Sequence, residues 1–173
     1  MEYPMITFNG RRPTPFEANE DDPDAASKPE RTYTRSDKHG LIGVIIHEIG
    51  HIYFPMTVNS DERQWTWMDE GLNTFVQFLA EQEFDRDYPS RRGSARDITS
   101  YMGGDKKRIS PIMTNSESIY QFGPNAYGKP CTALNILRET VMGRDLFDYS
   151  FKEYSRRWAF RHRERYLATI GRP

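Results

Sequence analysis

Two histidines and a glutamate stand close together in the segment His47-Glu48-Ile49-Gly50-His51. Positions four apart on an α-helix lie about 40° apart around the axis and about 6 Å apart along it. Both imidazole rings can therefore reach one metal ion from the same face, and Glu48 lies close to that face. Zinc prefers such nitrogen ligands, and a carboxylate beside it can act as a base on water. The spacing thus predicts a zinc site equipped for hydrolysis.

Glu70 offers a third ligand, 19 positions after His51. Apolar residues recur at helical spacing over 68–84, so we expect Glu70 in the first turn of a packed helix. The alternative is a helix whose histidines only make internal hydrogen bonds, because a short motif can arise by chance. The apolar run before His47 argues against that alternative, since polar groups in an apolar helix need partners.

The N-terminal part is expected to contain one strand and a long polar loop. Residues 3–8 are rich in aromatic and β-branched types and precede Asn9-Gly10, which favours a strand followed by a turn. Proline and acidic residues dominate the stretch that follows, and this predicts a polar loop over 11–35.

Helices are expected over most of the remaining chain. Ser36-Asp37 favours a helix N-cap, and the apolar run 41–46 predicts a helix that lies inside the domain and ends before Pro55. The apolar face of the helix at 68–84 runs from Met68 to Leu79, and Phe84 could extend it. A mixed region at 85–124 separates it from helices at about 127–142 and 145–161. We predict an α+β fold that is mainly helical.

Composition excludes several classes of protein. The chain has 173 residues, enough for one domain, and its net charge of −1 gives no electrostatic case for nucleic acid. It contains no apolar run of 18 residues, so no membrane segment is expected, and its first residues do not resemble a signal peptide. Cys131 is the single cysteine and is interpreted as a structural thiol.

Three segments resemble the aminopeptidase N family of gluzincin zinc peptidases. The first is H-E-x-x-H, 18 intervening residues and then Glu70 within a W-x-x-E-G segment. The second is Met1-Glu2-Tyr3-Pro4, similar to the end of the family's G-x-M-E-N motif with Tyr3 in place of the usual asparagine. The third is Asn125-Ala126-Tyr127-Gly128-Lys129, which resembles the family's catalytic tyrosine segment.

The resemblance implies a thermolysin-like zincin domain and a role for each matching residue. His47, His51 and Glu70 would hold one Zn²⁺ per chain, and Glu48 would be the general base. Tyr127 would donate its hydroxyl to the oxyanion, and Glu2 would bind the free α-amino group of a peptide substrate. The implied reaction is removal of N-terminal residues by a zinc-activated water.

The other polar candidates are given structural roles. His39 is interpreted as a capping or surface residue, and His162 as part of a solvated, arginine-rich helix end. Asp69 and Asn73 could orient the metal ligands, but the sequence alone does not assign them to the site.

The chain also departs from the family pattern. Family proteins are several times longer, with a β-rich domain before this region and a helical one after it. We therefore expect a partial catalytic domain over 1–161 and a divergent tail over 162–173. One alternative is a zinc-binding fragment without activity. Another is an endopeptidase of thermolysin type, against which Glu2 argues.

Overall fold

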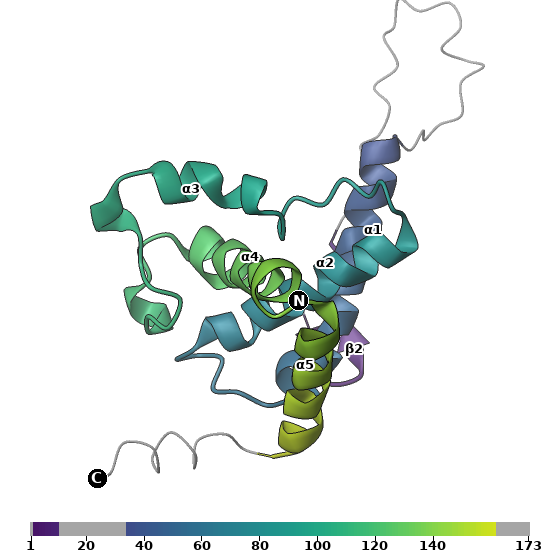
Figure 1. The fold of residues 1–173 in the computed structure, drawn as a ribbon. Coiled ribbons are helices and arrows are strands. Elements are labelled where there is room, and N and C mark those ends of the chain that lie inside the picture. Colours follow the sequence, from purple (N-terminus) through teal and green to yellow (C-terminus); the bar gives the residue numbers. More distant parts are fainter. Residues whose placement is uncertain (1, 11–33, 162–173) are drawn as a thin grey trace, which may run out of the picture.

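The computed structural model describes residues 2–10 and 34–161 (Figure 1). Its main helices are α1 (Arg35–Gly50), α2 (Glu70–Phe84), α3 (Thr99–Gly103), α4 (Lys129–Ile136) and α5 (Arg144–Trp158). Short helical turns connect them: η2 (Ile52–Thr57), η3 (Thr66–Met68), η4 (Ala95–Ile98), η5 (Lys106–Arg108), η6 (Ser116–Ser118), η7 (Pro124–Gly128) and η8 (Leu137–Val141). The expectation of a mainly helical fold with little strand is confirmed.

Helix α2 lies at the centre of the fold. It packs against α1 on one side and α4 on the other, and α5 crosses on the side of α4 (Figure 1). Two groups of buried side chains hold it there. One contains Phe54, Val58 and Leu72, and the other contains Phe75, Cys131 and Phe147.

Phe75 illustrates how this packing fixes α2. It is fully buried, and its ring meets Phe147 edge to face at 5.4 Å and Phe151 at 5.5 Å. Burying one such ring contributes about 1.5–3 kcal/mol to folding. Phe84, at the last position of α2, is 56% exposed, so it does not extend the apolar face of the helix. The helix has passed the end of the packed layer at that point.

Helix α1 begins two residues earlier than expected. Thr34 is its N-cap, and the Thr34 hydroxyl accepts a hydrogen bond from the Asp37 N–H at 3.1 Å. The Asp37 carboxylate in turn accepts from the Thr34 N–H at 3.0 Å. This reciprocal capping box satisfies two backbone donors, which explains why Thr34 rather than Ser36 starts the helix.

The end of α1 agrees with the effect expected of Pro55. The α-helix ends at Gly50, and η2 follows it. Phe54, just before the proline, leaves helical geometry with φ −123° and ψ 108°. A proline ring disfavours helical backbone in the preceding residue, so the chain turns away here.

The expectation that α1 lies inside the domain is wrong. Its apolar residues over 41–46 are only partly buried, and Ile49 is 54% exposed. Helix α2 packs against α1, and the described residues cover the rest of the apolar run only in part.

The N-terminal residues form a hairpin rather than one strand. Strands β1 (Glu2–Tyr3) and β2 (Ile6–Thr7) pair antiparallel, with Glu2 opposite Thr7. Pro4 and Met5 make the turn, and Met5 has a φ of 67°. Proline suits the first corner of a tight turn. The aromatic and β-branched residues on either side favoured a continuous strand, so the turn was not expected. Apart from Thr34 and Arg35, the expected loop at 11–35 lies outside the described residues, as does the tail at 162–173.

Candidate metal centre and catalytic site

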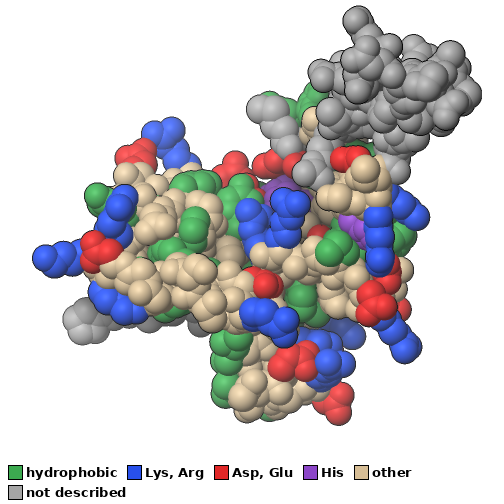
Figure 2. All heavy atoms as spheres, turned by 90° about the horizontal axis from the view of Figure 1, so that it is seen from above, with side chains coloured by type: hydrophobic (Ala, Val, Ile, Leu, Met, Phe, Trp, Pro, Cys, Tyr) green, Lys and Arg blue, Asp and Glu red, His purple; other side chains and the backbone are tan. Residues whose placement is uncertain are grey.

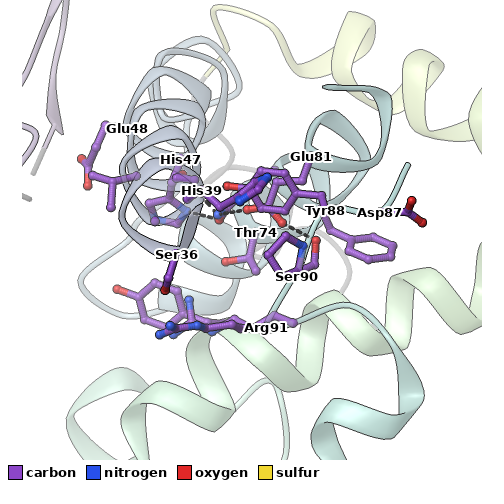
Figure 3. Close-up of a pocket in the computed structure, with 18 of the residues that line it drawn as sticks. Ser36, His39, His47, Glu48, Thr74, Glu81, Asp87, Tyr88, Ser90 and Arg91 are labelled. Carbon is purple, nitrogen blue, oxygen red and sulfur yellow. Dashed lines mark hydrogen bonds between the residues drawn. The ribbon is translucent and has the colours of Figure 1, made fainter. Parts of the chain in front are cut away.

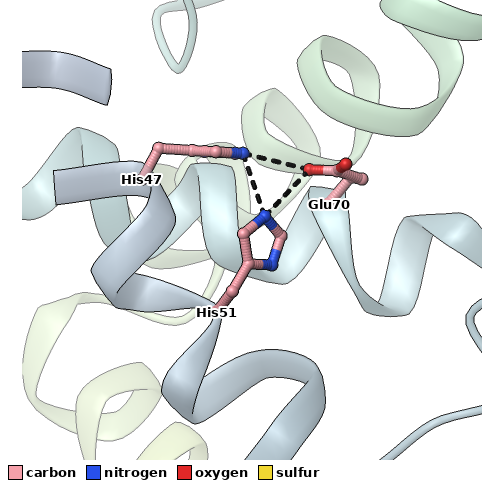
Figure 4. A group of neighbouring side chains, drawn as sticks. All are labelled: His47, His51 and Glu70. Carbon is pink, nitrogen blue, oxygen red and sulfur yellow. Dashed lines mark hydrogen bonds and ion pairs between the residues drawn. The ribbon is translucent and has the colours of Figure 1, made fainter. Parts of the chain in front are cut away.

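The two motif histidines lie at the C-terminal end of α1. His47 is in the last turn, and His51 caps the helix, with its backbone N–H donating to the His47 carbonyl at 3.3 Å. Glu70 is the first residue of α2. The packing of α2 against α1 brings this residue opposite the two rings, so two helices build the site (Figure 4).

Three ligand atoms converge between these helices. His47 Nε2 lies 3.0 Å from Glu70 Oε2 and 3.1 Å from His51 Nε2. His51 Nε2 lies 3.4 Å from the same Glu70 oxygen. Figure 4 shows the two imidazole edges and the carboxylate facing one another. The structure thus brings together the three residues that the sequence suggested as ligands.

Each histidine is oriented by its other ring nitrogen. His47 Nδ1 lies 2.8 Å from Gln77 Oε1, and His51 Nδ1 lies 2.8 Å from the Phe54 carbonyl oxygen. Both partners are acceptors, so each Nδ1 carries a proton. A neutral ring then has its lone pair on Nε2, at the point where the ligands meet.

This donor set fits zinc. Two imidazole nitrogens and one carboxylate oxygen are the protein ligands of many catalytic zinc sites, which keep a fourth position open. Two Nε2 atoms at 3.1 Å with lone pairs toward each other also require a cation or a proton between them. The site therefore has both the chemistry and the electrostatic need for a bound cation.

Charges at the site are strongly coupled. Burial opposes a charge on His51, but hydrogen bonds to Asp69 and Glu70 outweigh it and raise the pKa of His51 to about 10. Burial raises the pKa of Asp69 to about 6, against the opposing effect of His51. Burial would also raise the pKa of Glu70, yet hydrogen bonds from His47, His51 and Tyr127 hold it well below its usual range. Without a metal, the site thus retains a proton on His51.

Tyr127 adjoins the metal centre. It lies in η7, and its hydroxyl donates to Glu70 Oε1 at 2.6 Å. Its ring stacks on His47 with centroids 5.9 Å apart, and the Arg92 guanidinium lies 4.5 Å above the ring. Burial and the Glu70 carboxylate raise the pKa of Tyr127, so the phenol stays protonated. It is therefore a hydrogen-bond donor at neutral pH.

Glu2 and Glu48 form a second acidic group beside the site. Ligand atoms of Glu2, Glu48 and His51 all lie within 4.8 Å of one another. Glu48 is largely buried on α1, and Glu2 comes from strand β1. The hairpin thus brings a carboxylate from the start of the chain to the edge of the metal centre.

Close contact between α1 and α2 sets the spacing of the ligands. The Asn73 side-chain amide donates to the His47 carbonyl oxygen at 2.8 Å. A Cβ placed on Gly50 would lie 2.0 Å from Asn73 Oδ1. Only glycine leaves room for this asparagine, which was considered as an orienting residue from sequence.

Other residues differ from or extend the sequence interpretation. His39 is 7% exposed, so it is not a surface residue, and it belongs to neither of the two ligand groups at the metal centre. The Nδ1 atom of His39 lies 2.8 Å from the Arg35 carbonyl oxygen. The Tyr88 hydroxyl donates a hydrogen bond to the backbone carbonyl oxygen of His39. Cys131 is buried, and burial raises its pKa to about 12, in agreement with a structural thiol. His162 lies outside the described residues.

One contact of the ligands was missed from the sequence: Gln77 accepts from His47. Asp69, which was considered as an orienting residue, lies with its Oδ1 2.9 Å from His51 Nδ1. Gln77 lies seven positions after Glu70, two helical turns along the same face of α2. That spacing was the signal available in the sequence, once α1 and α2 were known to be neighbours.

A cleft of about 820 Å³ opens beside the metal centre and runs along α1. His47, Glu48 and Tyr127 line it near the metal centre, and Glu81, Tyr88 and Ser90 line it farther along. In Figure 3, Glu81, Tyr88 and Ser90 lie between α1 and the segment that follows α2, whereas Glu48 lies toward the other side of α1. In the view from above, histidine side chains are visible among acidic and basic ones (Figure 2). The cleft is open to solvent and is lined by both polar and apolar side chains.

Together these features define a candidate metallopeptidase site: two histidines and a glutamate converge, with a further glutamate between the histidines. Residues 25–166 match the peptidase family M1 domain, and the chain belongs to this family of zinc metallopeptidases. Searches for similar curated proteins and for similar solved structures gave no match. Among the described residues, no helix has the length and apolar character needed to cross a membrane.

Proposed function

We propose that the chain is a zinc-dependent aminopeptidase that removes N-terminal residues from peptides. The observation that carries this proposal is the shared position of His51. It belongs both to the ligand group with His47 and Glu70 and to the acidic group with Glu2 and Glu48. A metal position and an amine-binding position would then adjoin each other, as exopeptidase cleavage requires.

The position of Glu2 supports the proposal independently of the family match. That match covers residues 25–166, and Glu2 lies before it. Its carboxylate nevertheless lies within 4.8 Å of Glu48 and His51 ligand atoms. A carboxylate at this distance can accept hydrogen bonds from the α-ammonium group of a substrate and hold its first peptide bond near the metal.

Each residue has a definite task in the proposed reaction. His47, His51 and Glu70 hold the zinc ion, which when bound supplies Lewis acidity toward a water and a peptide carbonyl. Glu48 accepts a proton from the attacking water and transfers it to the departing amine. Tyr127 exchanges its bond to Glu70 for one to the oxyanion that develops on the substrate. The proposal includes a thermolysin-like fold for the part of the chain that holds these residues.

The test is hydrolysis of amino-acid anilides by the chain and by Glu48→Gln. We expect activity that requires zinc and falls at least about 10²-fold in the variant, because the general base is lost while the zinc ligands remain. N-acetylated substrates should be cleaved poorly, because they lack the free amine that Glu2 is proposed to bind.

Two results would contradict the proposal in different ways. Stoichiometric zinc without hydrolysis in either protein would indicate a zinc-binding module without turnover. Undiminished cleavage of N-acetylated substrates would reject amine recognition by Glu2 and favour an endopeptidase.

A further inference from the structure

A directed series of hydrogen bonds connects a buried carboxylate to the metal ligand His47. Gln77 Oε1 faces His47 Nδ1 at 2.8 Å, and Gln77 Nε2 donates to Glu81 Oε1 at 2.7 Å. The Ser90 hydroxyl donates to the other oxygen of Glu81. Glu81 is only 5% exposed, although it lies one helical turn beyond Gln77 and away from the ligand atoms.

The partners of Gln77 fix the orientation of its amide. Its nitrogen faces two acceptors, Glu81 Oε1 and the Gly43 carbonyl oxygen at 3.2 Å. Since an amide nitrogen can only donate, this arrangement turns the amide oxygen toward His47. The proton of His47 must then be on Nδ1, which leaves the Nε2 lone pair for the metal.

Glu81 is itself held as an acceptor on both oxygens. Gln82 Nε2 donates to Ser90 Oγ at 3.0 Å, so the Ser90 proton points to Glu81. Helix α1 makes room for the carboxylate with a glycine, because a Cβ on Gly43 would lie 3.1 Å from Glu81 Oε1. Figure 3 shows Glu81 and Ser90 joined within the cleft. The hydrogen bonds are thus fixed in direction at Glu81 as well as at His47.

We infer that Glu81 is a positioning residue, which sets the His47 tautomer for metal binding by orienting the Gln77 amide. This inference rests on the proposed metal site. An amide at position 81 would remove the nearer of the two acceptors of Gln77 and leave the Gly43 carbonyl oxygen at 3.2 Å. Gln77 could then turn its nitrogen toward His47 Nδ1, which would shift the proton to Nε2 and block the ligand lone pair.

The first experiment compares zinc affinity in wild type and Glu81→Gln by competition with a chelator. The substitution keeps the shape of the side chain. We expect affinity to fall about 10-fold or more, the usual effect of losing an outer partner of a metal ligand. Glu83→Gln is the matched control, because Glu83 is an exposed glutamate on the same helix. It should retain the wild-type affinity.

A second variant separates orientation from mere structural damage. The exchange Gln77→Glu with Glu81→Gln restores an obligatory acceptor next to His47 and a donor next to that acceptor. We expect the exchanged pair to recover most of the lost zinc affinity. Equal affinity in wild type and Glu81→Gln, or no recovery in the exchanged pair, would overturn the inference.

Nitrogen NMR of the zinc-free protein provides a readout that does not depend on metal. The neutral His47 ring of the wild type should carry its proton on Nδ1. In Glu81→Gln a substantial population should carry it on Nε2. An unchanged tautomer would contradict the inference even if zinc never binds, whereas absence of zinc from wild type with the expected tautomers would reject only the metal site.

Discussion

His51 lies between Asp69 and Glu70, and both carboxylates stabilise a proton on its ring. Its pKa of about 10 in the absence of metal means that zinc must displace this proton at neutral pH. Affinity should therefore rise about 10-fold per pH unit as pH increases toward 10. Calorimetric titration in buffers of different ionisation enthalpy should show release of about one proton per zinc at pH 7.

Asp69→Asn is the control for that proton. Removing the carboxylate lowers the pKa of His51, so fewer protons should be released at the same pH. Zinc binding that releases no proton at pH 7 would mean that His51 is already neutral and would contradict the description of the site.

Tyr127 is predicted to act in the transition state rather than in metal binding. Its hydroxyl bonds to Glu70 Oε1, whereas Glu70 Oε2 is the oxygen that faces the histidines. Tyr127→Phe should therefore leave zinc content unchanged. It should lower kcat about 10²–10³-fold with little change in KM, which steady-state kinetics can measure. A variant with normal kcat would remove Tyr127 from the mechanism.

At the scale of elements, the approach of α1 to α2 depends on Gly50. A Cβ at this position would lie 2.0 Å from Asn73 Oδ1, so Gly50→Ala must push the helices apart or displace the asparagine. We expect a loss of about 1–3 kcal/mol in unfolding free energy, measured by urea denaturation. Asn73→Ala should relieve the clash, so Gly50→Ala should cost much less in that background. Additive effects of the two substitutions would contradict this explanation.

Arg138 connects η8 to α5 through a bidentate ion pair. Its Nε and Nη2 lie 2.6 and 2.9 Å from the two oxygens of Asp148. The hydrogen bonds from Arg138 hold the pKa of Asp148 below its usual range. The stabilisation is therefore complete above the pKa of the unfolded chain and disappears as pH falls through the lower folded value.

Asp148→Asn measures this contribution. The carboxylate is about one-third exposed, so solvent screening limits the expected loss to under about 1 kcal/mol at pH 7. The difference from wild type should shrink as pH falls below 4. A difference that stays constant down to pH 2 would assign the effect to packing instead of charge.

The sequence pattern predicted those features of the site that are set by spacing within a single helix. His47 and His51 share a face because of helical geometry alone, and Glu70 was expected in the first turn of the next helix. Interactions across helices were less accessible. Neither Gln77 nor Glu81 belongs to a motif, and their connection to His47 exists only because α2 packs against α1. The burial of α1 was overestimated because its apolar composition does not specify which faces are covered.

At the scale of the whole molecule, the metal centre joins parts distant in sequence. It combines the end of α1, the start of α2, the turn η7 and the N-terminal hairpin. A cation that binds only when these parts are assembled should stabilise the folded state by a free energy that grows with the logarithm of its affinity. Zinc should thus raise the Tm of wild type and leave that of His51→Ala nearly unchanged.

The most direct test of the account is the zinc content of the purified chain, measured by elemental analysis beside His51→Ala and Glu70→Ala. We predict one zinc per wild-type chain, a large loss in both variants and full retention in Glu48→Gln, whose substitution spares the ligands. Absence of zinc from wild type, or equal zinc in wild type and the two ligand variants, would contradict the proposed metal centre.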